Sequence, residues 1–269
     1  METPDDMAAS HGGASPAPES GGTPPRATRK YNEINGVLLV DKAMDWTSHD
    51  VVNFVKHRFS PRKIGHCGTL DPMATGLLVL LLGKATKLQE SFMGESKIYE
   101  GSIKLGLETD SEDATGRITS ERGAAGVTRE MLEEAMAAMV GDSMQIPPMV
   151  SAIKKDGRPL YLLARKGVIV ERKPRPISIY SMEMLSCEMP CASFRVHCSK
   201  GTYVRTICAD IGRRLGCGGI MTALRRLQCG NFSVERACTV DQMKSWGYPE
   251  LENAVMPAER ALALAEGDA

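Results

Sequence analysis

The sequence has no apolar run long enough to cross a membrane. Its longest run, residues 77–82, is far shorter than the ~20 residues that a transmembrane helix needs and indicates a buried strand instead. Hydrophobic residues make up 42% and charged residues 25% of the 269-residue chain, which is typical of globular proteins. We therefore expect a soluble intracellular protein that does not bind a membrane; the sequence does not distinguish cytoplasm, nucleus and organelle.

Patterns typical of disulfide-rich scaffolds and metal sites are missing as well. Eight cysteines in a chain of this length do not indicate a small secreted scaffold, so we expect free thiols in a reducing compartment. A calcium loop at residues 110–121 is excluded because Thr115 replaces the required glycine. We expect no metal site, since four neighbouring residues match no standard zinc spacing: Cys187, Cys191, His197 and Cys198.

The chain carries no net charge, with 33 basic and 33 acidic residues, which argues against a nucleic-acid-binding protein. The charges are grouped, however. Residues 154–175 hold eight Lys or Arg against two acidic residues, and residues 195–226 hold seven against one. Residues 108–134 hold eight acidic residues against three basic ones. Such a chain can still present a positive surface to phosphate groups.

The first thirty residues differ in composition from the rest. They contain five Pro and four Gly and almost no large apolar side chains. Such a segment buries too little surface to offset its ordering entropy, so we expect residues 1–30 to be disordered. Its acidic residues argue against an organelle transit peptide. We expect one folded domain over residues 31–240 and a short tail over residues 241–269.

The hydrophobic pattern predicts an α+β fold. Strands are predicted at residues 36–40, 77–82, 99–105, 177–185 and 192–198. Helices are predicted at residues 48–58 behind a capping box of Thr47 and Asp50, at residues 128–140, and after Thr202 as N-cap. Because strands and helices alternate irregularly, we expect a mixed, mostly antiparallel sheet with flanking helices.

Departures from these patterns mark candidate functional residues. Residues 63–76 interrupt the regular elements with three glycines, and they place Asp71 just before a buried strand. Asp71 either caps a helix that Pro72 begins or lies at the rim of a pocket. Arg205 lies in the first turn of its predicted helix, where the helix dipole disfavours a cation. Unless it is solvated, Arg205 should have a carboxylate partner such as Asp71.

Two further candidates are an aromatic residue and a basic segment. Tyr99 shares the apolar face of its predicted strand and is either a half-buried core tyrosine or a site residue. Residues 151–167 mix cations, a tyrosine and turn residues. They form either a solvated charged loop or a flexible arm that grips a phosphate backbone.

Five motifs in one order resemble those of TruB-type tRNA pseudouridine synthases. They are residues 36–42, 65–76, 97–99, 151–158 and 199–205, within a matching region of about 34–240. The resemblance implies the pseudouridine synthase α+β fold with an active-site cleft along the sheet. It also implies isomerisation of a specific uridine to pseudouridine in RNA, with uridine-55 in the T loop of tRNA as the target.

The resemblance also implies roles for individual residues. Asp71 matches the catalytic aspartate, Tyr99 the active-site tyrosine, and Arg205 the arginine paired with that aspartate. His66 matches a histidine that fills the space left by the flipped base, and Asp113 matches an acidic residue near the site. The remaining candidate substrate-binding residues are Lys154, Lys155 and Arg158, in a thumb over residues 154–167 that closes on RNA, and Tyr203.

The implied chemistry requires base flipping. Uracil has to leave ribose C1′, rotate and rejoin through C5, so the nucleotide must leave its stack. Asp71 would act as the nucleophile, either by direct attack on C1′ or in a path through a glycal. No hydride, electron or phosphoryl group is transferred, so we expect no cofactor. Cys67 stands where the family usually has a small hydroxyl residue, which places an oxidisable thiol beside the site.

The implied partner is the T arm of tRNA, with mRNA as a further candidate substrate, and we expect a monomer. Only 29 residues follow Val240, too few for the RNA-binding PUA domain of many relatives, so we expect no PUA domain. Two other functions fit some of the motifs. One is a non-catalytic tRNA folding chaperone, and the other is the catalytic subunit of a guide-directed rRNA pseudouridylation particle.

Overall fold

The computed structural model describes residues 32–93, 96–151, 153–155, 157–164, 167–168 and 170–266. The predicted disorder of residues 1–30 concerns a segment outside these ranges. No helix in the described ranges is long and apolar enough to span a bilayer.

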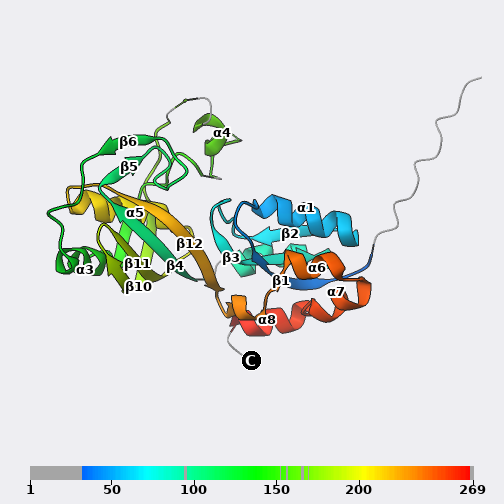
Figure 1. Ribbon diagram of the computed structural model, residues 1–269. Helices are drawn as coiled ribbons and strands as arrows, with labels where there is room; N and C mark the ends of the chain where they lie inside the picture. The colour runs from blue at the N-terminus through cyan, green and yellow to red at the C-terminus, as the bar shows by residue number, and fades with distance from the viewer. Residues whose placement is uncertain are drawn as a thin grey trace, which may run out of the picture. The chain divides into compact units, whose positions relative to one another are not determined.

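Ten strands of the described chain form one mixed, mostly antiparallel sheet, which confirms the predicted fold class (Figure 1). The order is β14-β1-β3-β12-β4-β11-β10-β7, with β2 paired to β3 and β13 to β12. Only β1–β14 and β3–β12 are parallel among these pairs. The strands are β1 (Gly36–Lys42), β2 (Ile64–Cys67), β3 (Thr75–Leu82), β4 (Lys97–Leu105), β7 (Gly141–Gln145), β10 (Arg175–Glu188), β11 (Cys191–Cys198), β12 (Gly219–Cys229), β13 (Phe232–Ser233) and β14 (Cys238–Thr239).

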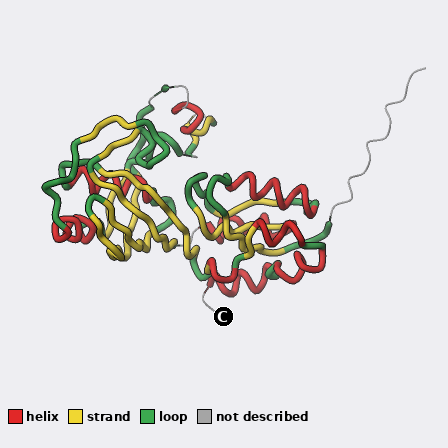
Figure 2. Tube along the Cα trace, viewed as in Figure 1, coloured by secondary structure: helices red, strands yellow, loops and turns green. Residues whose placement is uncertain are grey.

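Two short hairpins and a set of helices complete the described chain (Figure 2). The hairpins are β5 (Leu107–Thr109) with β6 (Ile118–Glu121), and β8 (Lys154–Lys155) with β9 (Arg158–Pro159). The helices are α1 (Ser48–Phe59), α2 (Gln89–Met93), α3 (Arg129–Ala137), α4 (Leu160–Ala164), α5 (Val204–Arg214), α6 (Val240–Ser245), α7 (Tyr248–Ala254) and α8 (Ala258–Glu266), with short 3₁₀ turns η1 (Gly83–Leu88) and η2 (Val234–Arg236).

The β1–β3 part of the sheet is covered on both faces. Leu78 and Leu80 of β3 pack against α1, α6 and α7, whereas Leu77 and Val79 pack against α2 and α8. A strand buried on both faces is continuously apolar, which explains the run at residues 77–82. The capping box predicted for α1 is also present, because the side chains and backbones of Thr47 and Asp50 bond reciprocally.

The β4–β11 part of the sheet is apolar on one face. Residues of β4 alternate between buried and half-buried, as predicted, and the buried face includes Tyr99 and Ile103. This face packs on α3 and α5 in a single cluster with Phe194 of β11. The helix predicted at residues 128–140 is shorter than expected, and its Met131 is exposed rather than part of the apolar side.

The C-terminal residues differ from the expected short tail. Residues 240–266 form α6, α7 and α8, and each of these helices buries at least one apolar side chain against the β1–β3 part of the sheet. Met243, Leu251 and Ala261 are fully buried there. The segment therefore contributes to the core, because without it both faces of β1 and β3 would expose leucine and valine side chains to water.

Candidate active site

A cavity of about 920 Å³ lies where the loop before β3 meets β4 and the start of α5. Asp71 comes from the loop, Tyr99 from β4, and Tyr203 and Arg205 from the N-terminal end of α5. The cavity therefore brings together four of the candidate residues, which are far apart in the sequence. Of the others, His66 and Asp113 do not belong to its lining.

The Asp71 loop is a turn and not a helix start. The Ala74 amide donates to the Asp71 carbonyl at 3.0 Å, and β3 follows at once, so the helix-cap interpretation of Asp71 and Pro72 is wrong. Ser48, the first residue of α1, fixes the loop through two bonds to the Leu70 backbone, at 2.9 and 3.2 Å. Ser48 thus holds the residue that precedes Asp71.

Lys42 holds the residue that follows Asp71, and it was not among the predicted site residues. This side chain at the end of β1 is fully buried. Its Nζ donates to the carbonyls of Ala43, Trp46 and Pro72 at 2.9, 2.6 and 3.2 Å. Burial lowers the pKa of Lys42 to about 8, and Asp71 opposes this shift. Lys42 therefore ties the Asp71 loop to β1 through the Pro72 carbonyl.

Arg205 is the partner of Asp71, as the resemblance implies, and is not solvated, the other alternative that its place in the helix left open. The Arg205 side chain is 3% exposed, and its Nε donates to Asp71 Oδ2 at 2.9 Å. Its Nη1 donates to the Ser111 carbonyl at 3.0 Å, and its Nη2 donates to the Val150 carbonyl at 2.9 Å. Arg205 is thus fixed in direction by the protein. Thr202, expected as the N-cap of this helix, does not cap it; the N-cap is Tyr203, without a side-chain bond.

Asp113 reaches the site through Arg205. Its Oδ2 lies 3.7 Å from Arg205 Nε, on a side chain that is 6% exposed. Its Oδ1 accepts hydrogen bonds from Ser111 Oγ and Thr115 Oγ1, both at 2.6 Å. The buried guanidinium therefore lies between two carboxylates, of which only Asp71 faces the cavity.

The pKa of Asp71 is raised above its ordinary value. Burial is the main cause, and the nearby Asp113 carboxylate raises it further. The Arg205 guanidinium acts in the opposite direction and limits the shift. Arg205 therefore keeps the charged form of Asp71 accessible in a site that would otherwise disfavour it.

Tyr99 and Arg226 form a second pair at the cavity wall. They lie opposite each other on β4 and β12, and both line the cavity. Burial raises the pKa of Tyr99 to about 12, while the Arg226 guanidinium lowers it. Arg226 is 1% exposed, and its Nε donates to the Leu77 carbonyl at 2.7 Å. Its Nη2 donates to the Gly68 carbonyl at 3.1 Å, so Arg226 also holds the Asp71 loop.

Arg226 was not among the predicted site residues, although the sequence holds one signal for it. Arg225 and Arg226 are consecutive residues of a strand, so their side chains point to opposite faces. Arg225 binds Asp41 through two hydrogen bonds, of 3.0 and 2.7 Å, on the more open face. Its neighbour must then point inward, where a buried cation needs polar partners.

His66 and Cys67 lie on β2, outside the cavity lining. Burial and the Arg226 guanidinium lower the pKa of the half-buried His66, which favours its neutral form. Cys67 is 1% exposed, and burial raises the pKa of its thiol to about 12. Burial therefore disfavours the reactive thiolate at this position, and the oxidation of Cys67 stays a prediction.

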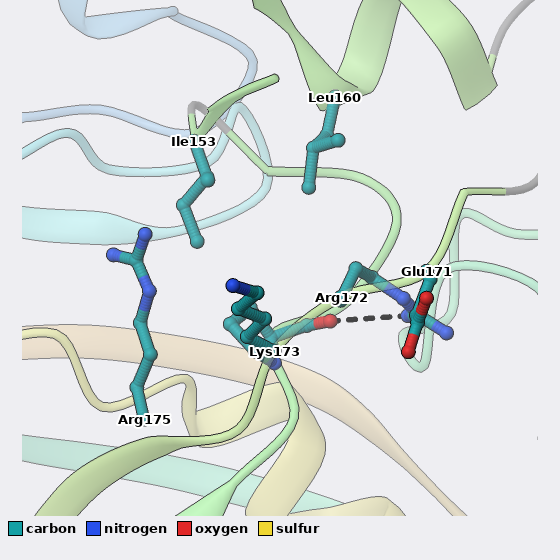
Figure 3. A pocket seen from close by; sticks show the side chains of 7 residues that line it. Ile153, Leu160, Glu171, Arg172, Lys173 and Arg175 are labelled. Carbon is teal, nitrogen blue, oxygen red and sulfur yellow. Dashed lines mark hydrogen bonds between the residues drawn. The ribbon is translucent and has the colours of Figure 1, made fainter. Parts of the chain in front are cut away.

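The basic segment contributes to a second, smaller pocket of about 260 Å³. Ile153 and Leu160 point into the same space as Lys173 and Arg175 (Figure 3). Arg172 borders it, with its Nη1 donating to the Pro147 carbonyl at 3.0 Å. Arg175 and Ile153 also line the large cavity, so the two spaces adjoin. The side chains of the predicted Lys154, Lys155 and Arg158 lie outside the described structure, although β8 and β9 place their backbones in a hairpin.

Two family models match most of the chain. Residues 56–204 match the TruB family pseudouridylate synthase N-terminal domain, and residues 205–263 match the tRNA pseudouridylate synthase B C-terminal domain. The tRNA pseudouridine synthase B of Syntrophotalea carbinolica is 49% identical over 230 residues, covering 84% of this chain and 75% of that protein. The protein of the same name from Opitutus terrae is 48% identical over 229 residues, covering 85% and 95%.

A solved structure shares the fold. A chain in the crystal structure of a Cbf5-Nop10-Gar1 complex superposes with a TM-score of 0.65 at 28% identity, over 86% of this chain. The present chain spans 61% of the length of that protein. Since the two family models together match most of the sequence, and since the cavity holds the paired Asp71 and Arg205 of the family motifs, the chain belongs to the TruB family of pseudouridine synthases.

Proposed function

We propose that this protein converts uridine-55 in the T loop of tRNA to pseudouridine, with Asp71 as the nucleophile. The observation that carries the proposal is the Asp71 carboxylate, bound at 2.9 Å by a buried arginine on the wall of a large cavity. Membership of the TruB family supports pseudouridine formation, and the names of its relatives support tRNA as the substrate.

The reaction exchanges one bond at ribose C1′ for another. The C1′–N1 bond breaks, the uracil rotates inside the cavity, and a C1′–C5 bond forms while C5 loses its proton and N1 gains one. Arg205 binds Asp71 Oδ2, which leaves Oδ1 free of protein hydrogen bonds in the described structure. We assign Oδ1 to the sugar, either as nucleophile at C1′ or as the group that starts a path through a glycal.

Tyr99 has two functions in this proposal. Its ring lies on the cavity wall and can stack on the uracil, which offsets part of the cost of flipping. Because its pKa is about 12, the resting phenol is neutral. Tyr99 can give its proton to N1 of the detached uracil, and the resulting phenolate, which the Arg226 guanidinium stabilises, can then take the C5 proton and return to the phenol.

Cations around both spaces suit an RNA backbone. Lys200 and Arg175 line the large cavity, and Arg175 with Lys173 borders the small one (Figure 3). Phosphate contacts of this kind position RNA without reading its sequence. All these residues, with Asp71 and Arg226, fall in the proposed catalytic domain, which we extend from the expected residues 31–240 to residue 266 because α6, α7 and α8 pack into its core. The role of the thumb, the use of mRNA and the monomeric state stay predictions.

The test is to map pseudouridine in an unmodified tRNA transcript after incubation with the purified protein. One new pseudouridine at position 55 supports the proposal. A matched transcript with cytidine at position 55 is the control, and it should gain none. Modification at another position, or in the control transcript, would refute the assigned target.

A further inference from the structure

Glu112 lies between two residues that both contact Arg205, yet it makes no bond to that arginine. The Ser111 carbonyl accepts from Arg205 Nη1 at 3.0 Å, and Asp113 Oδ2 lies 3.7 Å from Arg205 Nε. Glu112 Oε2 instead accepts a hydrogen bond of 2.6 Å from Thr206 Oγ1. Thr206 directly follows Arg205 in α5 and is itself buried. The Glu112 side chain therefore joins its own loop, residues 109–116, to the helix turn that carries Arg205.

The backbone at Glu112 adopts a conformation that glutamate rarely takes. Its φ is 64°, in the left-handed region where Gly, Asn and Asp are usual. The amide of Glu112 donates to the Thr109 carbonyl at 3.2 Å, and its carbonyl accepts from the Met221 amide at 3.1 Å. The chain reverses at this point, which turns the flanking Ser111 and Asp113 toward Arg205. Contacts on both sides of the residue are needed to maintain this shape.

The charges around Glu112 are consistent with a structural role for its hydrogen bond to Thr206. Burial raises the pKa of Glu112, while the Thr206 hydroxyl and then the Arg205 guanidinium lower it. Its carboxylate accepts from the third residue of α5, at the helix end where a negative charge is favourable. The Glu112 carboxylate thus offsets the charge of Arg205, which the helix dipole disfavours at the N-terminal end of α5.

We propose that Glu112 is a positioning residue for catalysis. Its bond to Thr206 locks the loop of residues 109–116 to the first turn of α5, so that the Arg205 guanidinium presents Nε to Asp71 in one direction. The inference rests on the proposed function of Asp71. Glu112 does not touch the substrate cavity, so it acts on the rate of the chemical step and leaves RNA binding unchanged.

The test compares kcat and KM for tRNA in Glu112→Ala and Glu112→Gln. Glutamine keeps an oxygen that can accept from Thr206, whereas alanine removes it. We expect Glu112→Ala to lower kcat roughly tenfold or more, the size of a lost hydrogen bond to a charged group, with KM unchanged. Glu112→Gln should recover most of that loss. Glu121→Ala, on the exposed strand β6, is the matched control and should match the wild type.

Thr206→Val removes the same hydrogen bond from the helix side. It replaces Glu112→Ala as the test if that variant fails to fold. It should lower kcat as Glu112→Ala does, and the double variant should be no slower than either single one. The inference is overturned if Thr206→Val keeps the wild-type kcat, if the two effects multiply, or if Glu112→Gln is as slow as Glu112→Ala. An inactive wild-type protein would instead overturn the proposed function.

Discussion

Arg205 Nε and Asp71 Oδ2 lie 2.9 Å apart, but the two side chains differ in environment. Arg205 is 3% exposed, whereas Asp71 is 35% exposed at the cavity wall. The arginine is fixed by two backbone carbonyls, so it defines the direction in which the carboxylate points. This asymmetry suits a nucleophile, because one partner is held by the protein and the other stays open to substrate.

Replacing Arg205 by alanine should lower both stability and activity. The change leaves Asp113 buried without its cation, and removing one partner of a buried pair costs ~3–5 kcal/mol of unfolding free energy. Urea unfolding measures the loss. Arg213→Ala is the matched control, because Arg213 lies on the same helix in an exposed pair with Asp210 and should change little. An Arg205→Ala protein as stable as the wild type would show that the pair is not buried in solution.

Activity should fall in acid with a midpoint above the ordinary range of an aspartate. The reaction needs the Asp71 carboxylate, and burial raises the pKa of Asp71. Because Arg205 lowers that pKa, Arg205→Gln should move the midpoint to higher pH. The pH dependence of the single-turnover rate tests both statements. A midpoint that stays in place or moves to lower pH in Arg205→Gln would contradict the assigned electrostatics.

Tyr99→Phe should separate stacking from proton transfer. Phenylalanine keeps the ring, so tRNA binding should be unchanged. It removes the oxygen whose charge Arg226 stabilises, so kcat should fall. Binding and single-turnover rates measure the two effects, with Tyr99→Ala expected to weaken both. A wild-type kcat in Tyr99→Phe would exclude the phenol oxygen from the reaction.

Cys67 should resist alkylation in the folded protein at neutral pH. Its buried thiol has a pKa raised to about 12. Cys191 is exposed and should react first, which makes it the internal control. Mass spectrometry of peptides after iodoacetamide treatment measures both sites. Rapid labelling of Cys67 without unfolding would mean that the loop beside β2 opens in solution.

Local patterns predicted one of the buried arginines and not the other. Arg205 was a candidate because a cation in the first turn of a helix is either solvated or paired with a carboxylate, and the family resemblance paired it with Asp71. Arg226 gave a weaker signal, since its carbonyl partners come from Gly68 and Leu77. Those bonds depend on the parallel pairing of β12 with β3, which joins segments about 150 residues apart. Tertiary pairing of this kind has no local signature in the sequence.

The C-terminal helices show a similar limit. Half of residues 241–266 are hydrophobic, but the sequence analysis predicted only a short tail there. Met243 and Leu251 become buried because the β1–β3 part of the sheet offers apolar residues on both faces. The run of residues 77–82 indicated such a strand, but which segments would cover it depends on the fold of the whole chain. In contrast, α1 was predicted closely because its capping box is local.

The measurement that tests the central claim most directly is pseudouridine formation by Asp71→Asn in a single-turnover assay on unmodified tRNA. Asparagine keeps the shape but lacks the nucleophilic carboxylate. The asparagine oxygen can still accept from Arg205 Nε, and Asp113 remains as a charged partner of Arg205, so the variant should fold. We predict normal tRNA binding and no pseudouridine. Pseudouridine at position 55 formed by Asp71→Asn at the wild-type rate would contradict the assignment of Asp71 as the nucleophile.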